Sequence, residues 1–155
     1  GYLHLVSGSD VTGLTRNKAM RLSFRPMSLC HPVTYLNKIL IGGAKGELHL
    51  VNYRTRKIIH RFTCLESDKS GISSIAQSPA LDTIGVGTCR GAVHLINIQS
   101  DTLLFSLHHE KGTAVTGMSF RSDAIAASSG VAPLAVASGN TVTVWDLRRN
   151  EDTGF

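Results

Sequence analysis

The feature that most constrains this chain is a short strand-like motif that recurs at an almost constant spacing. Its copies read GYLHLVS, GELHLVN, GAVHLIN and NTVTVWD, and they start at Gly1, Gly46, Gly91 and Asn140. The first three copies start 45 residues apart, and the fourth follows 49 residues after the third. A repeat of about 40–45 residues that contains several strands is typical of a β-propeller blade. The spacing therefore predicts an all-β propeller.

Positions at the two ends of the motif support this prediction. A Trp-Asp pair at the end of a strand marks one class of propeller, the WD repeat, and the fourth copy ends in such a pair. The second and third copies carry asparagine where the fourth carries aspartate. Glycine opens the same two copies, where a tight turn needs a positive φ angle. The predicted structural repeat positions are Gly46, Asn52, Gly91, Asn97, Trp145 and Asp146.

At about 45 residues per blade, the 155 residues correspond to about three and a half blades. We expect one partial propeller over 1–155, with blade pieces 1–24, 25–62, 70–108 and 112–155. Closed propellers have about four to eight blades, so we expect a longer protein to complete the ring.

The strands of each blade are lettered a to d from the inside outwards. The second blade is predicted at 27–31, 38–41, 47–52 and 58–62, and the third at 72–77, 83–87, 92–98 and 103–107. The fourth is predicted at 114–120, 134–138 and 141–147, with an insertion of small residues at 124–132. For the first blade we expect strand c at 1–6, a loop at 7–17 and strand d at 19–24.

Composition narrows the classes of function. Hydrophobic residues make up 42% of the chain and charged residues 17%, which is typical of a globular domain rather than a disordered one. No apolar run approaches the 18 residues of a membrane span. Three scattered cysteines favour a reducing compartment. The net charge of +5 is compatible with a phosphate-bearing partner.

The candidate metal and catalytic residues favour structural roles. His4, His49 and His94 occupy equivalent positions in successive blades. Packed sheets lie about 10 Å apart, whereas a zinc ion needs nitrogens at about 2 Å. We therefore expect these histidines to pack between blades and to be hydrogen-bonded there. No Gly-x-Ser-x-Gly elbow marks a nucleophile, and the acidic residues show no repeated placement at a channel rim. We predict no catalytic residue, no metal site, no cofactor and no small-molecule substrate.

Basic residues are the candidate binding groups. The densest run lies on the turn between strands c and d of the second blade and enters strand d, and adjacent blades carry one further cation each on the turn between strands b and c. These residues are Arg54, Arg56, Lys57 and Arg61, and Lys45 and Arg90. Clustered cations hold phosphates; the alternative is a solvated turn whose charge keeps the protein soluble. A looser second cluster consists of Arg16, Lys18, Arg21 and Arg25.

Three further runs carry a family resemblance. They are 29–42 (LCHPVTYLNKILIG), 78–82 (SPALD) and 115–123 (VTGMSFRSD). Together they resemble the first propeller of the WD-repeat subunit of the UTP-B subcomplex of the small-subunit processome, a U3 small nucleolar RNA-associated family. The resemblance covers about 24–147 and departs at the insertion of small residues. It implies a nucleolar scaffold with two tandem propellers and a C-terminal helical part, without known catalysis.

The combined hypothesis is a non-enzymatic scaffold that supports pre-rRNA processing and small ribosomal subunit biogenesis. The expected partners are other UTP-B and processome proteins, and the basic rims are candidates for contact with U3 small nucleolar RNA or pre-rRNA. No membrane partner is expected. The alternatives are a generic WD-repeat adaptor outside ribosome biogenesis and an enzyme on a propeller scaffold.

Overall fold

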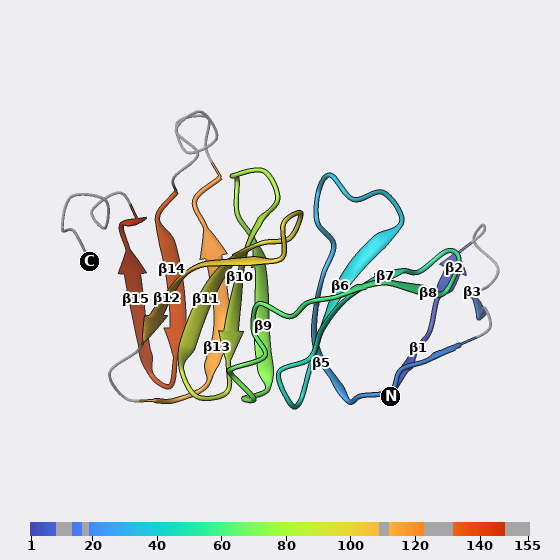
Figure 1. Cartoon of the computed structure of the whole chain (residues 1–155), viewed down its shortest axis with the longest axis horizontal. Helices are drawn as coiled ribbons and strands as arrows, with labels where there is room; N and C mark the ends of the chain where they lie inside the picture. Colours follow the sequence, from blue (N-terminus) through green and yellow to red (C-terminus); the bar gives the residue numbers. More distant parts are fainter. Residues whose placement is uncertain (9–13, 17–18, 109–111, 123–131, 148–155) are drawn as a thin grey trace.

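The computed structural model describes residues 1–8, 14–16, 19–108, 112–122 and 132–147. These residues form fifteen β-strands in five antiparallel sheets. The two two-stranded sheets lie near the N-terminal end of the long axis, and the three-stranded sheet lies near its other end (Figure 1). The all-β propeller prediction is confirmed. No helix in the described part is long and apolar enough to cross a membrane.

The second and third blades are complete four-stranded meanders. The second consists of β5 (Pro26–Cys30), β6 (Lys38–Gly43), β7 (Leu48–Asn52) and β8 (Lys57–Arg61). The third consists of β9 (Ile72–Gln77), β10 (Thr83–Thr88), β11 (Ala92–Asn97) and β12 (Thr102–His108). Their strands lie within one or two residues of the predicted bounds, and β9 matches its prediction at both ends.

The fourth blade also follows the prediction, as far as the structure describes it. Its strands are β13 (Val115–Phe120), β14 (Leu134–Ser138) and β15 (Thr141–Trp145). Apart from Ala132, which is buried, the predicted insertion of small residues lies outside the described residues. Its neighbours β13 and β14 still pair directly, so the blade tolerates the extra length.

The first blade differs from its prediction. Its strands are β1 (Tyr2–Leu3), β2 (Val6–Gly8), β3 (Leu14–Arg16) and β4 (Met20–Arg21). Strand β1 pairs with β4, as strands c and d should. However, β2 pairs with β3, so a pair of strands includes the last residue of the predicted strand at 1–6 and residues 7, 8 and 14–16 of the predicted loop at 7–17.

The hydrophobic core lies between blades rather than within them. Leu48 and Leu50 of strand c in the second blade pack against Ile84 and Val86 of strand b in the third. The next interface repeats this pattern: Val93, Leu95 and Leu107 face Val115, Leu134 and Val136. Because the sheets of the second and third blades are covered on both faces, their inner strands are apolar on both faces.

The period of 45 residues extends to the backbone conformation. Non-glycine residues have positive φ angles at two pairs of positions, each pair 45 residues apart: Asn37 with Asp82, and Arg56 with Asp101. Gly46 and Gly91 have φ angles of 81° and 85°, as predicted for the turns that they open. The repeat therefore specifies turn geometry as well as strand pattern.

Candidate interaction surfaces

The strand order gives each blade two ends with different loops. In an antiparallel meander, the a–b and c–d turns lie at one end of the strands, and the b–c turn and the d–a connection lie at the other. We call these the a–b end and the b–c end.

At the a–b end, the c–d turn of the second blade presents Arg54, Arg56 and Lys57, all exposed. The Asn52 side chain fixes this turn, because its Oδ1 accepts hydrogen bonds from the backbone N–H groups of residues 54 and 55, at 3.0 and 2.9 Å. Asn97 makes the same bonds in the third blade, to residues 99 and 100. Asparagine therefore provides the turn-capping oxygen where the fourth copy of the motif has Asp146.

Arg61 does not join the other three cations of its run. Lys57 pairs with Asn52 at the a–b end of strand β8, whereas Arg61 pairs with His49 at its b–c end. A five-residue strand is about 13 Å long. The sequence run therefore divides into a cluster of three cations and a single cation at the opposite end.

The a–b end also carries an apolar groove that crosses three blades. Its volume is about 460 Å³, and it is lined by Val33, Thr34, Gln77, Ser78, Pro79, Ala80, Leu81, Phe120 and Ser122. Leu36 lies in the same a–b turn as Val33. It is 80% exposed, and Leu81, its equivalent 45 residues later, is 68% exposed. An apolar side chain presented at the same loop position in successive blades is a feature of a protein-binding surface.

At the b–c end, Lys45 and Arg90 lie on equivalent turns of adjacent blades, as the sequence indicated. The structure brings Arg25 and Lys69 to the same end. The backbone N–H of Ala44 donates to the carbonyl of Arg25 at 3.0 Å. A Cβ atom on Gly46 would lie 3.4 Å from the Cα of Lys69. In the sequence, Arg25 groups with a different cluster of cations, and Lys69 stands at no repeated basic position.

His94 is the centre of a buried hydrogen-bond network in the third blade. Its Nε2 lies 3.0 Å from Asp68 Oδ2, and its Nδ1 lies 2.7 Å from Ser106 Oγ. An ionised carboxylate only accepts, so Nε2 donates to Asp68, and in the neutral ring Nδ1 accepts from Ser106. Desolvation raises the pKa of Asp68, but hydrogen bonds from Ser70 and His94 outweigh it and lower that pKa to about 2.

This serine, histidine and aspartate set is structural, because His94 is only 7% exposed. It joins strands β11 and β12 to the connection that precedes β9. The prediction that this histidine packs and is hydrogen-bonded is confirmed.

His49, the equivalent residue of the second blade, lacks these partners. Ser23 and Arg61 stand 45 residues before Asp68 and Ser106. His49 instead packs edge-on against Phe24, with ring centroids 4.6 Å apart, and its buried Nδ1 has no hydrogen-bond partner among the described residues. Burial and the nearby Arg61 lower its pKa.

At His49, the prediction that the ring packs between blades is confirmed. The prediction that it is hydrogen-bonded is wrong for Nδ1. The packing prediction is also wrong at His4, which is exposed. Among the described residues, no sheet of another blade packs against the first blade at His4.

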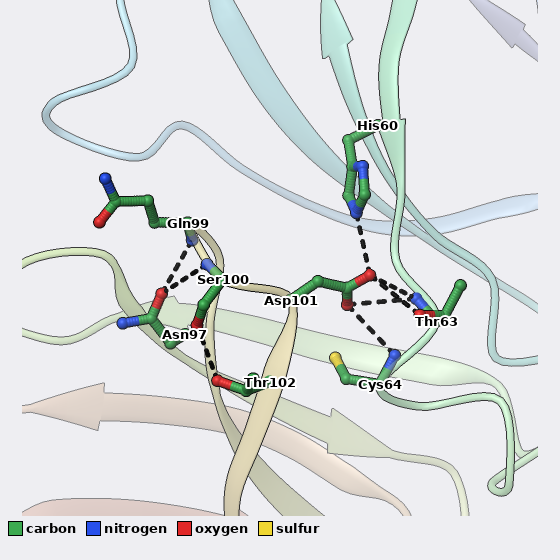
Figure 2. Close-up of polar contacts among 8 residues, drawn as sticks. All are labelled: His60, Thr63, Cys64, Asn97, Gln99, Ser100, Asp101 and Thr102. Carbon is green, nitrogen blue, oxygen red and sulfur yellow. Dashed lines mark hydrogen bonds and ion pairs between the residues drawn. The ribbon is translucent and has the colours of Figure 1, made fainter.

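A second polar network links the second and third blades (Figure 2). Asp101, in the c–d turn of the third blade, accepts from the backbone N–H groups of Thr63 and Cys64 and contacts His60 Nε2 at 3.0 Å. Desolvation raises the pKa of Asp101, but these hydrogen bonds lower it well below its usual range. Burial, together with Asp101, raises the pKa of Cys64 to about 12. The thiol is therefore protonated and unreactive at neutral pH.

Within the described ranges, no three His, Cys, Asp or Glu side chains converge as metal ligands would. The three cysteines are free thiols.

Comparison with known proteins identifies the family. Residues 3–154 match the model of the WDR36/Utp21 first beta-propeller. The chain belongs to this family. WD repeat-containing protein 36 of Homo sapiens is 31% identical over 144 residues, which cover 93% of this chain and 15% of the human protein. The U3 small nucleolar RNA-associated protein 21 homolog of Schizosaccharomyces pombe is 36% identical over 125 residues, which cover 79% of this chain and 12% of that protein.

The chain spans about 15% of the length of the human relative and 12% of that of the fission yeast relative. Among solved structures, the crystal structure of RRP9 WD40 repeats superposes with a TM-score of 0.65 at 17% identity. That match covers 84% of this chain and 38% of the solved chain, and it supports the WD-repeat fold.

Proposed function

We propose that the protein is a non-enzymatic assembly platform of the small-subunit processome. In this role it acts in the nucleolus within the UTP-B subcomplex and supports pre-rRNA processing for the small ribosomal subunit. The observation that carries the proposal is membership of the WDR36/Utp21 family, together with the U3 small nucleolar RNA-associated name of the fission yeast relative.

The a–b end suits a protein partner. Its groove is largely apolar, Val33 and Leu81 in its lining are exposed, and Leu36 extends the apolar surface beyond it, with exposures of 68–81% for the three side chains. A partner that inserts apolar side chains here would bury surface that the blades leave in water, at about 25 cal/mol per Å² of apolar area. Exposed cations at the b–c end of the blades suit an RNA partner, U3 small nucleolar RNA or pre-rRNA, whereas the three cations of the c–d turn share the a–b end with the apolar groove.

Affinity purification of the intact protein from cells tests this proposal. We expect other processome subunits and U3 RNA to co-purify in amounts comparable to the bait. Leu36→Asp combined with Leu81→Asp should reduce the recovery of protein subunits while the propeller stays folded, because both side chains are already exposed. Recovery of a complex unrelated to ribosome biogenesis would contradict the proposal and favour a general adaptor.

A further inference from the structure

We propose that four cations at the b–c end of the blades form a binding site for the phosphate backbone of RNA. We call this set the basic stripe; it consists of Arg25, Lys45, Lys69 and Arg90. The inference rests on the proposed function, because it assigns the surface through which such a platform would contact RNA.

The stripe is continuous because hydrogen-bonded loops connect its members. The Arg25 carbonyl accepts from the N–H of Ala44, the residue before Lys45. The 68–71 segment covers Gly46 on the other side of Lys45. The carbonyl of Gly71 accepts from the N–H of Cys89, the residue before Arg90, at 2.8 Å. Four loops thus run side by side from the entry of the second blade to the b–c turn of the third.

The stripe is electropositive because its four cations outnumber the carboxylates of the same loops, and none of these carboxylates forms a salt bridge with a cation of the stripe in the described part of the chain. Asp68 accepts from His94 and from Ser70. Glu47 Oε2 accepts from the backbone N–H of residue 45 at 2.8 Å. Glu66 is the exposed acid of the 66–71 segment. All four cations of the stripe are exposed, and none has a salt-bridge partner among the described residues.

The chemistry of the stripe favours a nucleic acid over a protein. Protein interfaces depend on apolar and aromatic anchors, and the loops at 44–47, 66–71 and 89–91 carry no exposed large apolar side chain. Single cations on successive loops suit a ligand with regularly repeated negative charge, and phosphate contacts fix position without reading sequence. Aromatic residues are only 6% of the chain, so base stacking would add little sequence preference.

The test is RNA binding by the intact protein at several salt concentrations, with a labelled 20-nucleotide oligouridylate as the probe. The stripe variant combines Lys45→Ala, Lys69→Ala and Arg90→Ala. The matched control combines Arg54→Ala, Arg56→Ala and Lys57→Ala, which removes the same charge at the a–b end. Single-stranded RNA contributes a slope of about −0.7 per phosphate contact to log K against log salt.

We expect the stripe variant to bind at least ten-fold more weakly, with a slope shallower by about 2. The control should change affinity less than three-fold, and Lys45→Arg with Lys69→Arg should retain wild-type binding. Equal effects of the two triple variants, or no effect of the stripe variant, would overturn the proposal. A third result would also overturn it: the stripe variant binds RNA like the wild type but loses a protein partner in purifications treated with ribonuclease. That result would indicate that the ligand of the stripe is an acidic protein.

The outcome is separable from that of the proposed function. A protein that binds oligouridylate through the stripe but does not co-purify with processome subunits would support the stripe and contradict the proposed function. Co-purification with the processome, combined with unchanged RNA binding by the stripe variant, would support the proposed function and contradict the stripe.

Discussion

Two glycines in the b strands show why a propeller needs small residues at single positions. Gly42 and Gly87 are equivalent, 45 residues apart, and each faces the first residue of strand a in the next blade. A Cβ atom on Gly42 would lie 2.6 Å from Cγ2 of Ile72, and one on Gly87 would lie 2.6 Å from Cγ1 of Val115. Their role is close packing of neighbouring blades.

Gly87→Ala should therefore destabilise the propeller by about 1–3 kcal/mol, the usual range for overpacking a core. Gly117→Ala is the matched control, because a Cβ atom there meets nothing within 4 Å. Thermal unfolding of the intact protein measures both. Equal melting temperatures for the two variants would contradict this account of blade packing.

Asp68 provides a prediction about acid stability. Its pKa is lowered in the folded protein, from 3.8 to about 2, so its contribution is fully present above pH 4 and is lost as the pH falls towards 2. Discounted for partial exposure, this contribution is about 1–2 kcal/mol.

Asp68→Asn should remove this contribution, so the variant should lose less stability than the wild type between pH 4 and pH 2. Unfolding in urea at each pH measures the difference. Parallel pH profiles for the two proteins would contradict the role assigned to the carboxylate.

At the scale of elements, residues 62–65 pack between the second and third blades. Phe62 and Leu65 are buried in the core of that interface, and Asp101 holds the segment through the backbone of Thr63 and Cys64. The Asp101 carboxylate therefore links the c–d turn of the third blade to the segment that follows β8 of the second blade, and it stabilises the contact between the two blades.

Asp101→Asn should loosen this segment and leave the turn intact, since asparagine also tolerates the positive φ of 53° at this position. We expect faster hydrogen exchange at the amides of Thr63 and Cys64. Ser100→Ala is the control, because among the described residues the Ser100 side chain bonds only within its own turn, to Thr102. Unchanged protection in Asp101→Asn would show that apolar packing alone holds the segment.

Elements of the complete blades could be predicted closely because the repeat fixes their register. The first blade could not, since β2 and β3 are three-residue strands in a polar, turn-rich stretch. No alternation of apolar and polar residues distinguishes such strands from a loop.

For the whole molecule, the repeat predicts that the exposed apolar face of β15 is covered in the intact protein. Val142 and Val144 are each 68% exposed, whereas Val93 and Leu95, 49 residues earlier, are 2% exposed beneath the fourth blade. By this equivalence, we expect another blade to cover Val142 in the intact propeller.

Val142→Asp should then destabilise the intact protein by about 2–4 kcal/mol, as expected for an unpaired charge in a core. Val33→Asp is the control, since Val33 is 81% exposed on an a–b turn. Equal melting temperatures of the two variants would contradict the expected cover.

Surfaces were less predictable than the fold, because charge placement does not follow the repeat. Lys45 and Arg90 could be paired from their spacing. Lys69 could not be assigned to this set from the sequence, because the equivalent positions of the neighbouring blades hold Phe24 and Ala114, which carry no charge. Only the packing of the 68–71 segment over Gly46 brings Lys69 beside the other cations.

The most direct test of the central claim, a role in small-subunit biogenesis, is the ratio of small-subunit to large-subunit rRNA after depletion of the protein from cells. The account predicts that new small-subunit rRNA falls, with unprocessed precursor accumulating, while large-subunit rRNA continues to be made. A ratio that stays constant as the protein is depleted would contradict a role in the small-subunit processome, and only the assignment of the propeller fold would remain.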